Sequence, residues 1–316
     1  MTHLKRVEIF KPLNFHEWKT IEEISESRNL KAGDIIFEKE FFDKYLVCIE
    51  DGLLEMVPID LAPPVPLAKF YKGSIIGEER LFTQNVPSIG VMVERDSNIL
   101  IIPKRDLKHL FKYSHRMLLK FLHIFSFSLS DKIRKVNTTL FDLLKNPVFS
   151  HHKTFHDPDE MSQTDRSAVC DTPKVESKIL AKIKTMSSHK RFIKHHKIFL
   201  EGEYGDLMYI IEKGSVRIFK QRENRTRQTI ADLGAGDFFG EMAFVDELPR
   251  SASAIVTSEY VELIVIPRKM MKKILNCGEF LGFNFLSLIC NILSLRFKCT
   301  VERIYQSTGY PNPLLS

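Results

Sequence analysis

The sequence predicts an α+β fold of two tandem antiparallel β-barrel (jelly-roll-like) domains, each flanked by helices and followed by a long C-terminal helix. Short runs of β-branched and aromatic residues, separated by glycines and charged turns, predict the strands. The same pattern occurs twice, 163 positions apart, and predicts two copies of one domain. A long apolar run at helical spacing follows each set of strands.

In the second copy, the strands are predicted from runs rich in Ile, Val, Tyr and Phe. These runs are residues 208–211, 216–219 and 261–266. Helical spacing of apolar residues then begins at Pro267 and continues from 283 to about 306.

The first copy repeats these features in the same order. Residues 30–57 match the early strands of the second copy, and Gly73 and Gly77 stand 163 positions before Gly236 and Gly240. The exit strand is repeated too, because residues 99–104 resemble residues 263–268. An apolar helix is predicted from about 113 to 144.

These patterns divide the chain into four parts. They are a first domain at 1–145, a linker at 146–174, a second domain at 175–306 and a tail at 307–316. The linker is polar and contains prolines. Its histidines, His151, His152 and His156, have no cysteine or tight carboxylate cluster nearby, so we expect no metal site.

Residues 239–254 carry the most informative chemistry in the chain. Glu241 and Arg250 stand nine residues apart, and Gly240 precedes the carboxylate. An arginine offers a permanently charged planar fork that suits a cyclic phosphodiester, and an ionised glutamate accepts hydrogen bonds from sugar hydroxyls. The alternative is an ordinary surface ion pair on a turn. The accompanying glycine and small residues favour the binding site.

The small residues of this stretch would let a ligand approach the backbone. Ala243, Ser251 and Ala252 have short side chains, and consecutive backbone N–H groups can form an anion-binding concavity. Ser251 adds a hydroxyl beside Arg250. The predicted ligand-binding residues are Gly240, Glu241, Met242, Ala243, Arg250, Ser251 and Ala252.

This stretch resembles the phosphate-binding cassette of the cyclic nucleotide-binding domain family, with Phe-Gly-Glu, a short loop, then Pro-Arg and small residues. The resemblance covers residues from about 193 to 268. It implies that Glu241 takes the ribose 2′-hydroxyl and Arg250 the cyclic phosphate, with the N–H of Ala243 and Ser251 completing the cradle. The implied ligand is cAMP or cGMP, with no cofactor. A hydroxyl at 251 permits both, and we favour cAMP.

The first cassette lacks the arginine. It begins with Gly77 and Glu78, but Pro87 stands where Arg250 would be, or Ser88 if the prolines are aligned. Neither residue can neutralise a phosphate, and proline has no N–H to donate. Nothing in the sequence aims Arg80 at the site. We therefore expect a degenerate first domain that binds no nucleotide.

The two long apolar helices need a partner surface. Similarity to the catabolite activator branch of the family suggests a dimer and a helix that moves over the bound base. Lys298, Cys299 and Thr300 are the candidate base contacts, with solvent or a partner helix as the alternative.

Composition fits a cytoplasmic protein. The hydrophobic content is 44%, no secretory signal opens the chain, and the five cysteines show no paired spacing, so we expect thiols in a reducing compartment. The apolar stretch at 280–295 is interrupted by polar residues, so no membrane span is expected. The net charge of +6 is spread along the chain, and no DNA-reading module is expected after Tyr305.

The sequence therefore predicts a non-enzymatic cyclic-nucleotide receptor whose second domain binds the ligand. The sequence contains no catalytic motif of a kinase, cyclase or hydrolase. One alternative is a scaffold of two such domains that binds no nucleotide. The other is a kinase-regulatory-subunit-like protein, although the sequence contains no Arg-Arg pair typical of an inhibitor segment.

Overall fold

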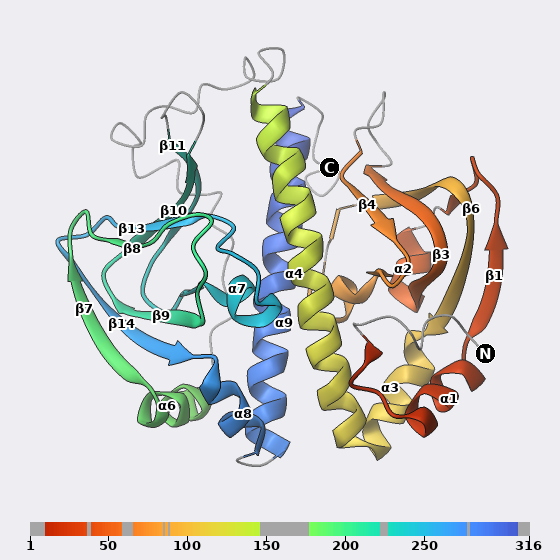
Figure 1. The fold of residues 1–316 in the computed structure, drawn as a ribbon, viewed down its shortest axis with the longest axis horizontal. Helices are drawn as coiled ribbons and strands as arrows, with labels where there is room; N and C mark the ends of the chain where they lie inside the picture. The colour runs from red at the N-terminus through yellow and green to blue at the C-terminus, as the bar shows by residue number, and fades with distance from the viewer. Residues whose placement is uncertain are drawn as a thin grey trace. The chain divides into compact units, whose positions relative to one another are not determined.

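The computed structural model describes residues 10–36, 39–58, 66–84, 86–87, 89–145, 177–221, 227–276 and 279–308 (Figure 1). The chain forms two compact units. The first comprises Met1–Thr154 and Leu293–Ser316, and the second comprises Phe155–Ile292. The predicted linker and all but the start of the predicted tail lie outside the described residues. Residues 293–306, which the sequence assigns to the second domain, group with the first unit.

The first unit is built on one antiparallel sheet. Its strands are β1 (Glu26–Leu30), β2 (Ile35–Ile36), β3 (Tyr45–Pro58), β4 (Ala68–Tyr71), β5 (Ile75–Ile76) and β6 (Ile89–Pro103). The long strands β3 and β6 pair with each other, β1 and β2 pair with β6, and β4 and β5 pair with β3. Buried Ile, Val and Leu side chains of β3 and β6 form much of the core.

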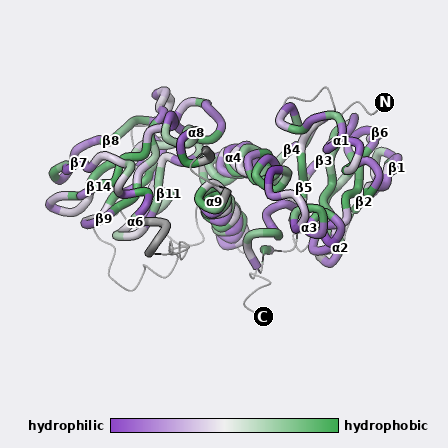
Figure 2. The backbone as a smooth tube through the Cα atoms, turned by 90° about the horizontal axis from the view of Figure 1, so that it is seen from below, coloured by the Kyte–Doolittle hydropathy of each residue, from purple (hydrophilic) through white to green (hydrophobic). Residues whose placement is uncertain are grey.

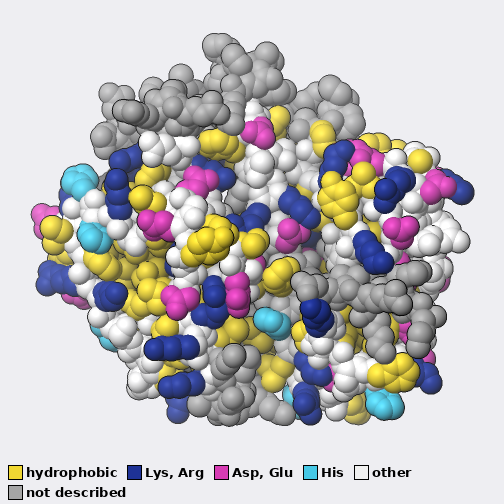
Figure 3. All heavy atoms as spheres, in the orientation of Figure 1, with side chains coloured by type: hydrophobic (Ala, Val, Ile, Leu, Met, Phe, Trp, Pro, Cys, Tyr) yellow, Lys and Arg dark blue, Asp and Glu magenta, His cyan; other side chains and the backbone are white. Residues whose placement is uncertain are grey.

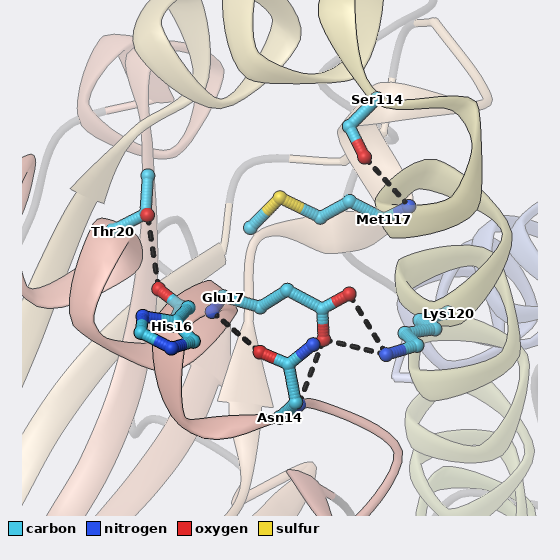
Figure 4. A network of polar contacts seen from close by, with 7 residues as sticks. All are labelled: Asn14, His16, Glu17, Thr20, Ser114, Met117 and Lys120. Carbon is cyan, nitrogen blue, oxygen red and sulfur yellow. Dashed lines mark hydrogen bonds and ion pairs between the residues drawn. The ribbon is translucent and has the colours of Figure 1, made fainter.

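The first unit also contains helices, which stand before, between and after the strands in the chain. They are α1 (Phe15–Glu23), α2 (Lys39–Lys44), the 3-10 helix η3 (Glu78–Leu81), α3 (Lys104–Tyr113) and α4 (His115–Lys145). Asn14 and Glu17 form a capping box at the start of α1. Glu17 also accepts a hydrogen bond from Lys120 of α4 at 2.8 Å, which ties α1 to α4 (Figure 4).

The second unit contains two four-stranded antiparallel sheets. One has the order β11-β10-β13-β8 and the other β12-β9-β14-β7. Their strands are β7 (Ser188–Ile193), β8 (Lys197–Phe199), β9 (Leu207–Lys213), β10 (Val216–Gln221), β11 (Arg227–Leu233), β12 (Phe238–Phe239), β13 (Ser253–Val256) and β14 (Tyr260–Pro267). Both sheets contribute to one hydrophobic core, with Tyr209 and Phe239 from one and Val216 and Ala254 from the other.

The remaining helices are α6 (Ser177–Met186), α7 (Glu241–Asp246), α8 (Lys269–Asn276) and α9 (Glu279–Ser307). The second half of α9 belongs to the first unit, where Thr300 donates a hydrogen bond to Asn137 Oδ1 of α4 at 3.0 Å. By length and composition alone, Phe280–Ser307 could span a membrane. More than half of its most apolar stretch is buried, as in the core helix of a folded protein.

The predicted fold class is confirmed, since both units carry antiparallel sheets and helices, and long helices follow the strands. Hydrophobic stretches run along the strands of each unit (Figure 2). Basic and acidic side chains are interspersed over the face drawn in Figure 3, as expected for a solvated surface.

The cysteines differ from the prediction at one position. Cys48 and Cys290 are buried thiols outside any disulfide, and burial raises the pKa of Cys48. Cys299 is disulfide-bonded, so the prediction that all five cysteines are thiols is wrong. The spacing of the cysteines did not indicate this bond.

Candidate functional site

The turn between β12 and α7 places the predicted carboxylate inside the second unit. Gly240 has a left-handed φ of 78°, and α7 begins at the next residue, Glu241. A Cβ on Gly240 would stand 2.8 Å from the Arg250 Nη1 atom and 3.2 Å from the Leu207 carbonyl oxygen. Only glycine meets both the backbone and the space requirement. Glu241 is fully buried.

Arg250 lies against this turn and is only 4% exposed. Its Nη1 donates to the Gly240 carbonyl at 2.8 Å, and its Nη2 donates to the Leu207 carbonyl at 2.6 Å. Its Nε has no hydrogen-bond partner among the described residues. Burial lowers the pKa of Arg250 from its usual value, while the nearby Tyr209 and Glu241 favour the charged form. These two hydrogen bonds hold the Arg250 guanidinium beside Gly240, the residue that precedes Glu241.

Two neighbours fix the plane of the guanidinium. Arg250 Cζ lies 4.3 Å from the centre of the Phe199 ring, a distance typical of a cation–π contact. A Cβ on Gly205 would stand 2.5 Å from Arg250 Nε and Nη2, so the guanidinium packs directly on the backbone there. The loop before β9 thus has a glycine where the arginine needs room.

Arg268, at the end of β14, braces the same region from another side. Its Nε donates to the Phe244 carbonyl at 3.0 Å and its Nη2 to the Gly205 carbonyl at 3.2 Å, with a further short bond to the Ala243 carbonyl. It therefore links α7 to the loop that receives Arg250.

The remaining predicted cassette residues gather around α7. Met242, Ala243 and Ala252 are buried, and the Ser251 hydroxyl lies 3.5 Å from the Met242 sulfur. Thioether sulfur is a weak acceptor, so this hydroxyl can turn to a stronger acceptor at small cost. The structure thus brings six of the seven predicted cassette residues together around the start of α7, and Ala252 is the buried residue that follows Ser251.

In the first unit, the corresponding turn has the same backbone but different neighbours. Gly77 has a left-handed φ of 97° and η3 begins at Glu78. The side chain nearest a Cβ on Gly77 is the ring of Phe42, at 3.2 Å. Phe42 therefore lies over Gly77 as Arg250 lies over Gly240.

The buried carboxylates of this first cassette contact α4. Lys132 Nζ lies 2.8 Å from Glu78 Oε2 and 2.6 Å from Glu79 Oε2. Ser128 donates to Glu78 Oε1 at 2.7 Å. Lys132 and the nearby Lys104 overcome the effect of burial and lower the pKa of Glu79 to about 2.

At the position that corresponds to Arg250, Pro87 is buried and its carbonyl accepts a hydrogen bond from Arg80 Nη2 at 3.3 Å. Arg80 Nη1 also pairs with Asp43 at 2.9 Å. The Arg80 guanidinium is thus engaged by a carboxylate within its own unit. Ser88, the other candidate at this position, lies outside the described residues.

Sequence reasoning missed four residues of these sites: Phe199, Arg268, Phe42 and Lys132. One of these residues, Arg268, has a counterpart at the same place in the first copy of the repeat. Lys104 follows Pro103 as Arg268 follows Pro267, and Lys104 donates to the carbonyl of Phe42, 163 positions before Gly205. Because a basic residue follows the last strand in both copies, the sequence could have suggested that it bonds to the backbone of the cassette region in each domain.

The candidate base contacts lie on the half of α9 that belongs to the first unit. Lys298 Nζ reaches the Gln84 carbonyl at 3.5 Å and Thr300 contacts Asn137, both within that unit. Cys299 is disulfide-bonded. Their role toward a base stays a prediction. Among the described residues, no group of His, Cys, Asp and Glu could hold a metal ion, and the linker histidines are outside them.

Comparison with protein families gives two matches in this chain. The model of the cyclic nucleotide-binding domain matches residues 27–114 and 189–276, which together make up more than half of the chain. Each match contains one of the two cassettes.

The relatives include receptors and kinases. The chain is 39% identical over 72 residues to the cyclic AMP receptor protein of Thermus thermophilus, covering 23% of this chain and 33% of the relative. It is 36% identical over 87 residues to a cGMP-dependent protein kinase of Caenorhabditis elegans, covering 27% and 11%. It is 33% identical over 96 residues to the cAMP-dependent protein kinase type II regulatory subunit of Drosophila melanogaster, covering 30% and 25%. The chain thus matches a third or less of the length of each.

Solved structures are also similar. A cyclic nucleotide-binding domain from Methylobacillus flagellatus is 24% identical with a TM-score of 0.38, covering 53% of this chain and 83% of the other. The regulatory domain of Toxoplasma gondii PKA with cAMP is 18% identical with a TM-score of 0.28, covering 88% and 91%.

Proposed function

Since the chain belongs to the cyclic nucleotide-binding domain family, we propose that it is a non-enzymatic receptor whose second domain binds a cyclic nucleotide. In this proposal Arg250 holds the cyclic phosphate, and Glu241 accepts a hydrogen bond from the ribose 2′-hydroxyl. The first domain, which lacks the arginine, binds no nucleotide.

The observation that carries the proposal is the buried guanidinium of Arg250. Its hydrogen bonds go to the carbonyl oxygens of Gly240 and Leu207, which are neutral, so its positive charge is available to an anion. Its Nε, which has no partner among the described residues, is a further donor. An ordinary surface ion pair would instead be exposed and paired with a carboxylate. A cyclic phosphodiester would supply an anion that can bond directly to this guanidinium.

The small residues of the cassette support the same ligand. Ala243 and Ala252 leave the backbone approachable, and the Ser251 hydroxyl can exchange the Met242 sulfur for a phosphate oxygen. Each charge-assisted hydrogen bond contributes about 1.5–3 kcal/mol, so a few of them suffice for micromolar affinity after ordering costs.

The proposed nucleotide is cAMP, although Ser251 is compatible with cGMP as well. Lys298, Cys299 and Thr300 are the proposed base contacts. Binding would then change the surroundings of α9.

Signalling follows from that change. Nucleotide shifts the population toward a state in which the cassette and α9 close together, and a protein partner or a second copy of the chain reads the altered helix. Such a shift requires that the two states differ in affinity for the nucleotide. We place this receptor in the cytoplasm and propose no nucleic-acid partner.

The competing function is a scaffold of two such domains that binds no nucleotide, or a subunit that regulates a kinase. Titration calorimetry of the full chain with cAMP and cGMP distinguishes a receptor from a scaffold. A heat of binding with micromolar affinity supports the receptor, and no heat with either nucleotide at millimolar concentration contradicts it.

The same titration with two variants identifies the site. Arg250→Ala removes the phosphate partner, and we expect affinity to fall about 10- to 150-fold. Arg217→Ala is the matched control, because Arg217 pairs with Asp232 on the surface of the same unit at 2.7 Å. Binding that Arg250→Ala leaves unchanged would place the nucleotide elsewhere.

A further inference from the structure

The first cassette contains a buried cluster of charges that the proposed nucleotide site does not use. Lys132 of α4 is fully buried, and its ammonium lies between Glu78 and Glu79 at 2.8 and 2.6 Å. Ser128, one helical turn earlier, binds the other oxygen of Glu78 at 2.7 Å. Residues four apart lie on the same face of a helix, so one face of α4 supplies both groups.

This cluster cannot be an incidental surface pair. Removing two carboxylates and an ammonium from water is costly unless they are paired and hydrogen-bonded to one another. Lys132 Nζ also lies 6.0 Å from the centre of the Phe70 ring and 5.4 Å from that of Phe297. The ammonium is therefore enclosed by two anions and two aromatic rings.

The cluster also occupies the groups that a ligand would need. Glu78 holds the place in the first cassette that Glu241 holds in the second, and both of its oxygens already accept hydrogen bonds from α4. The Phe42 ring lies over Gly77, where the second cassette has the guanidinium of Arg250. A soluble ligand would have to displace Lys132, and the Arg80 guanidinium is already paired with Asp43.

The second half of α9 rests on the same helix. Within the first unit, Phe297 covers the Lys132 ammonium and Thr300 binds Asn137 of α4 at 3.0 Å. Residues 293–307 of α9 therefore pack on an α4 whose position is set by the buried charges.

We propose that Lys132 and Ser128 act as a built-in ligand of the first cassette, and that the first domain thereby holds residues 293–307 of α9 in the absence of nucleotide. The cation comes from this chain itself. The inference goes beyond nucleotide binding by the second domain and stands whether or not that domain binds cAMP.

Hydrogen exchange of the full chain, without nucleotide, tests this proposal. Lys132→Met leaves two buried carboxylates uncompensated, so exchange in α4 and in residues 293–307 is expected to rise about a hundredfold or more. Lys135→Met is the matched control, because Lys135 lies on the same helix and pairs with Asp131 at a partly exposed position. It should change exchange by less than about fivefold.

A charge-balanced variant covers the case in which Lys132→Met does not fold. The combination of Lys132→Met, Glu78→Gln and Glu79→Gln removes the charges together, and replacing a buried ionic group as a whole is often tolerated. If slow exchange in α4 returns in this triple variant, the loss in Lys132→Met was caused by the unpaired charges of Glu78 and Glu79, as the proposal requires. Unchanged exchange in Lys132→Met would overturn the proposal. So would protection of residues 78–84 of the natural chain by 1 mM cAMP.

Discussion

The two cassettes of this chain have the same backbone conformation at the glycine-glutamate turn and differ in the side chains that pack on it. Both begin with a left-handed glycine and a buried glutamate, Gly77-Glu78 and Gly240-Glu241. In the second, an arginine guanidinium lies over the glycine and donates to carbonyl oxygens. In the first, a phenylalanine ring lies there and a lysine neutralises the glutamate.

The difference shows how a binding site can be lost while its fold is kept. Glu79 and Arg80 replace Met242 and Ala243, and each introduced charge has found its own partner, Lys132 for Glu79 and Asp43 for Arg80. Glu78, which is buried like Glu241, accepts hydrogen bonds from Ser128 and Lys132 of α4. Lys132 supplies the compensating charge that a bound ligand cannot.

The largest effect on the second cassette is expected from Gly205→Ala. The new Cβ would stand 2.5 Å from two guanidinium nitrogens, so Arg250 must leave its place, and nucleotide affinity should fall about 10- to 150-fold, as for Arg250→Ala. Gly234→Ala is the control, because a Cβ there meets nothing within 4 Å. Calorimetry measures both, and equal affinities would show that Arg250 is not confined as described.

A pH series sharpens the description of the first cassette. The pKa of Glu79 is lowered to about 2 although burial opposes this, because Lys132 and Lys104 stabilise the anion. A carboxylate with a depressed pKa contributes stability above its unfolded pKa of about 4.5, and this contribution disappears as the pH falls toward 2. Glu79→Gln should therefore destabilise the protein by about 1–3 kcal/mol at pH 7.

Denaturant unfolding of the natural chain and Glu79→Gln, from pH 7 down to pH 3, measures this difference. The gap between the two should narrow below about pH 4.5. A gap that stays constant over the series would mean that Lys132 does not hold Glu79 as an anion.

The smallest effect is expected from Phe199→Leu. This change removes the ring that lies 4.3 Å from Arg250 Cζ but keeps an apolar side chain of similar size. A cation–π contact is worth about 0.5–1 kcal/mol, so affinity should fall about two- to fivefold. Phe192→Leu, at a partly buried position packed against the same core, is the control. No difference between the variants would mean that the ring only fills space.

The sequence was sufficient to predict the tandem fold and the members of the second cassette, because both depend on local patterns. Alternating β-branched runs marked the strands, and the repeat marked the two domains. Glu241 and Arg250 were recognisable because they stand on one short stretch with a glycine and small residues.

Contacts between distant segments were beyond the sequence. Lys132 is 54 residues from Glu78, and in an apolar helix it looks like an ordinary surface charge. Phe199 and Arg250 are brought together only by the fold. The grouping of residues 293–307 with the first unit likewise depends on packing that periodicity does not record.

The number of nucleotides bound per chain tests the asymmetry of the two cassettes most directly. Equilibrium dialysis of the full chain with radiolabelled cAMP should give one bound nucleotide per chain at saturation. In the Arg250→Ala variant, the number of nucleotides bound at the same free concentrations should fall to about half or less, in line with a loss of affinity of about 10- to 150-fold. Two nucleotides per chain, or one that persists in Arg250→Ala, would contradict a single working cassette beside one closed by its own helix.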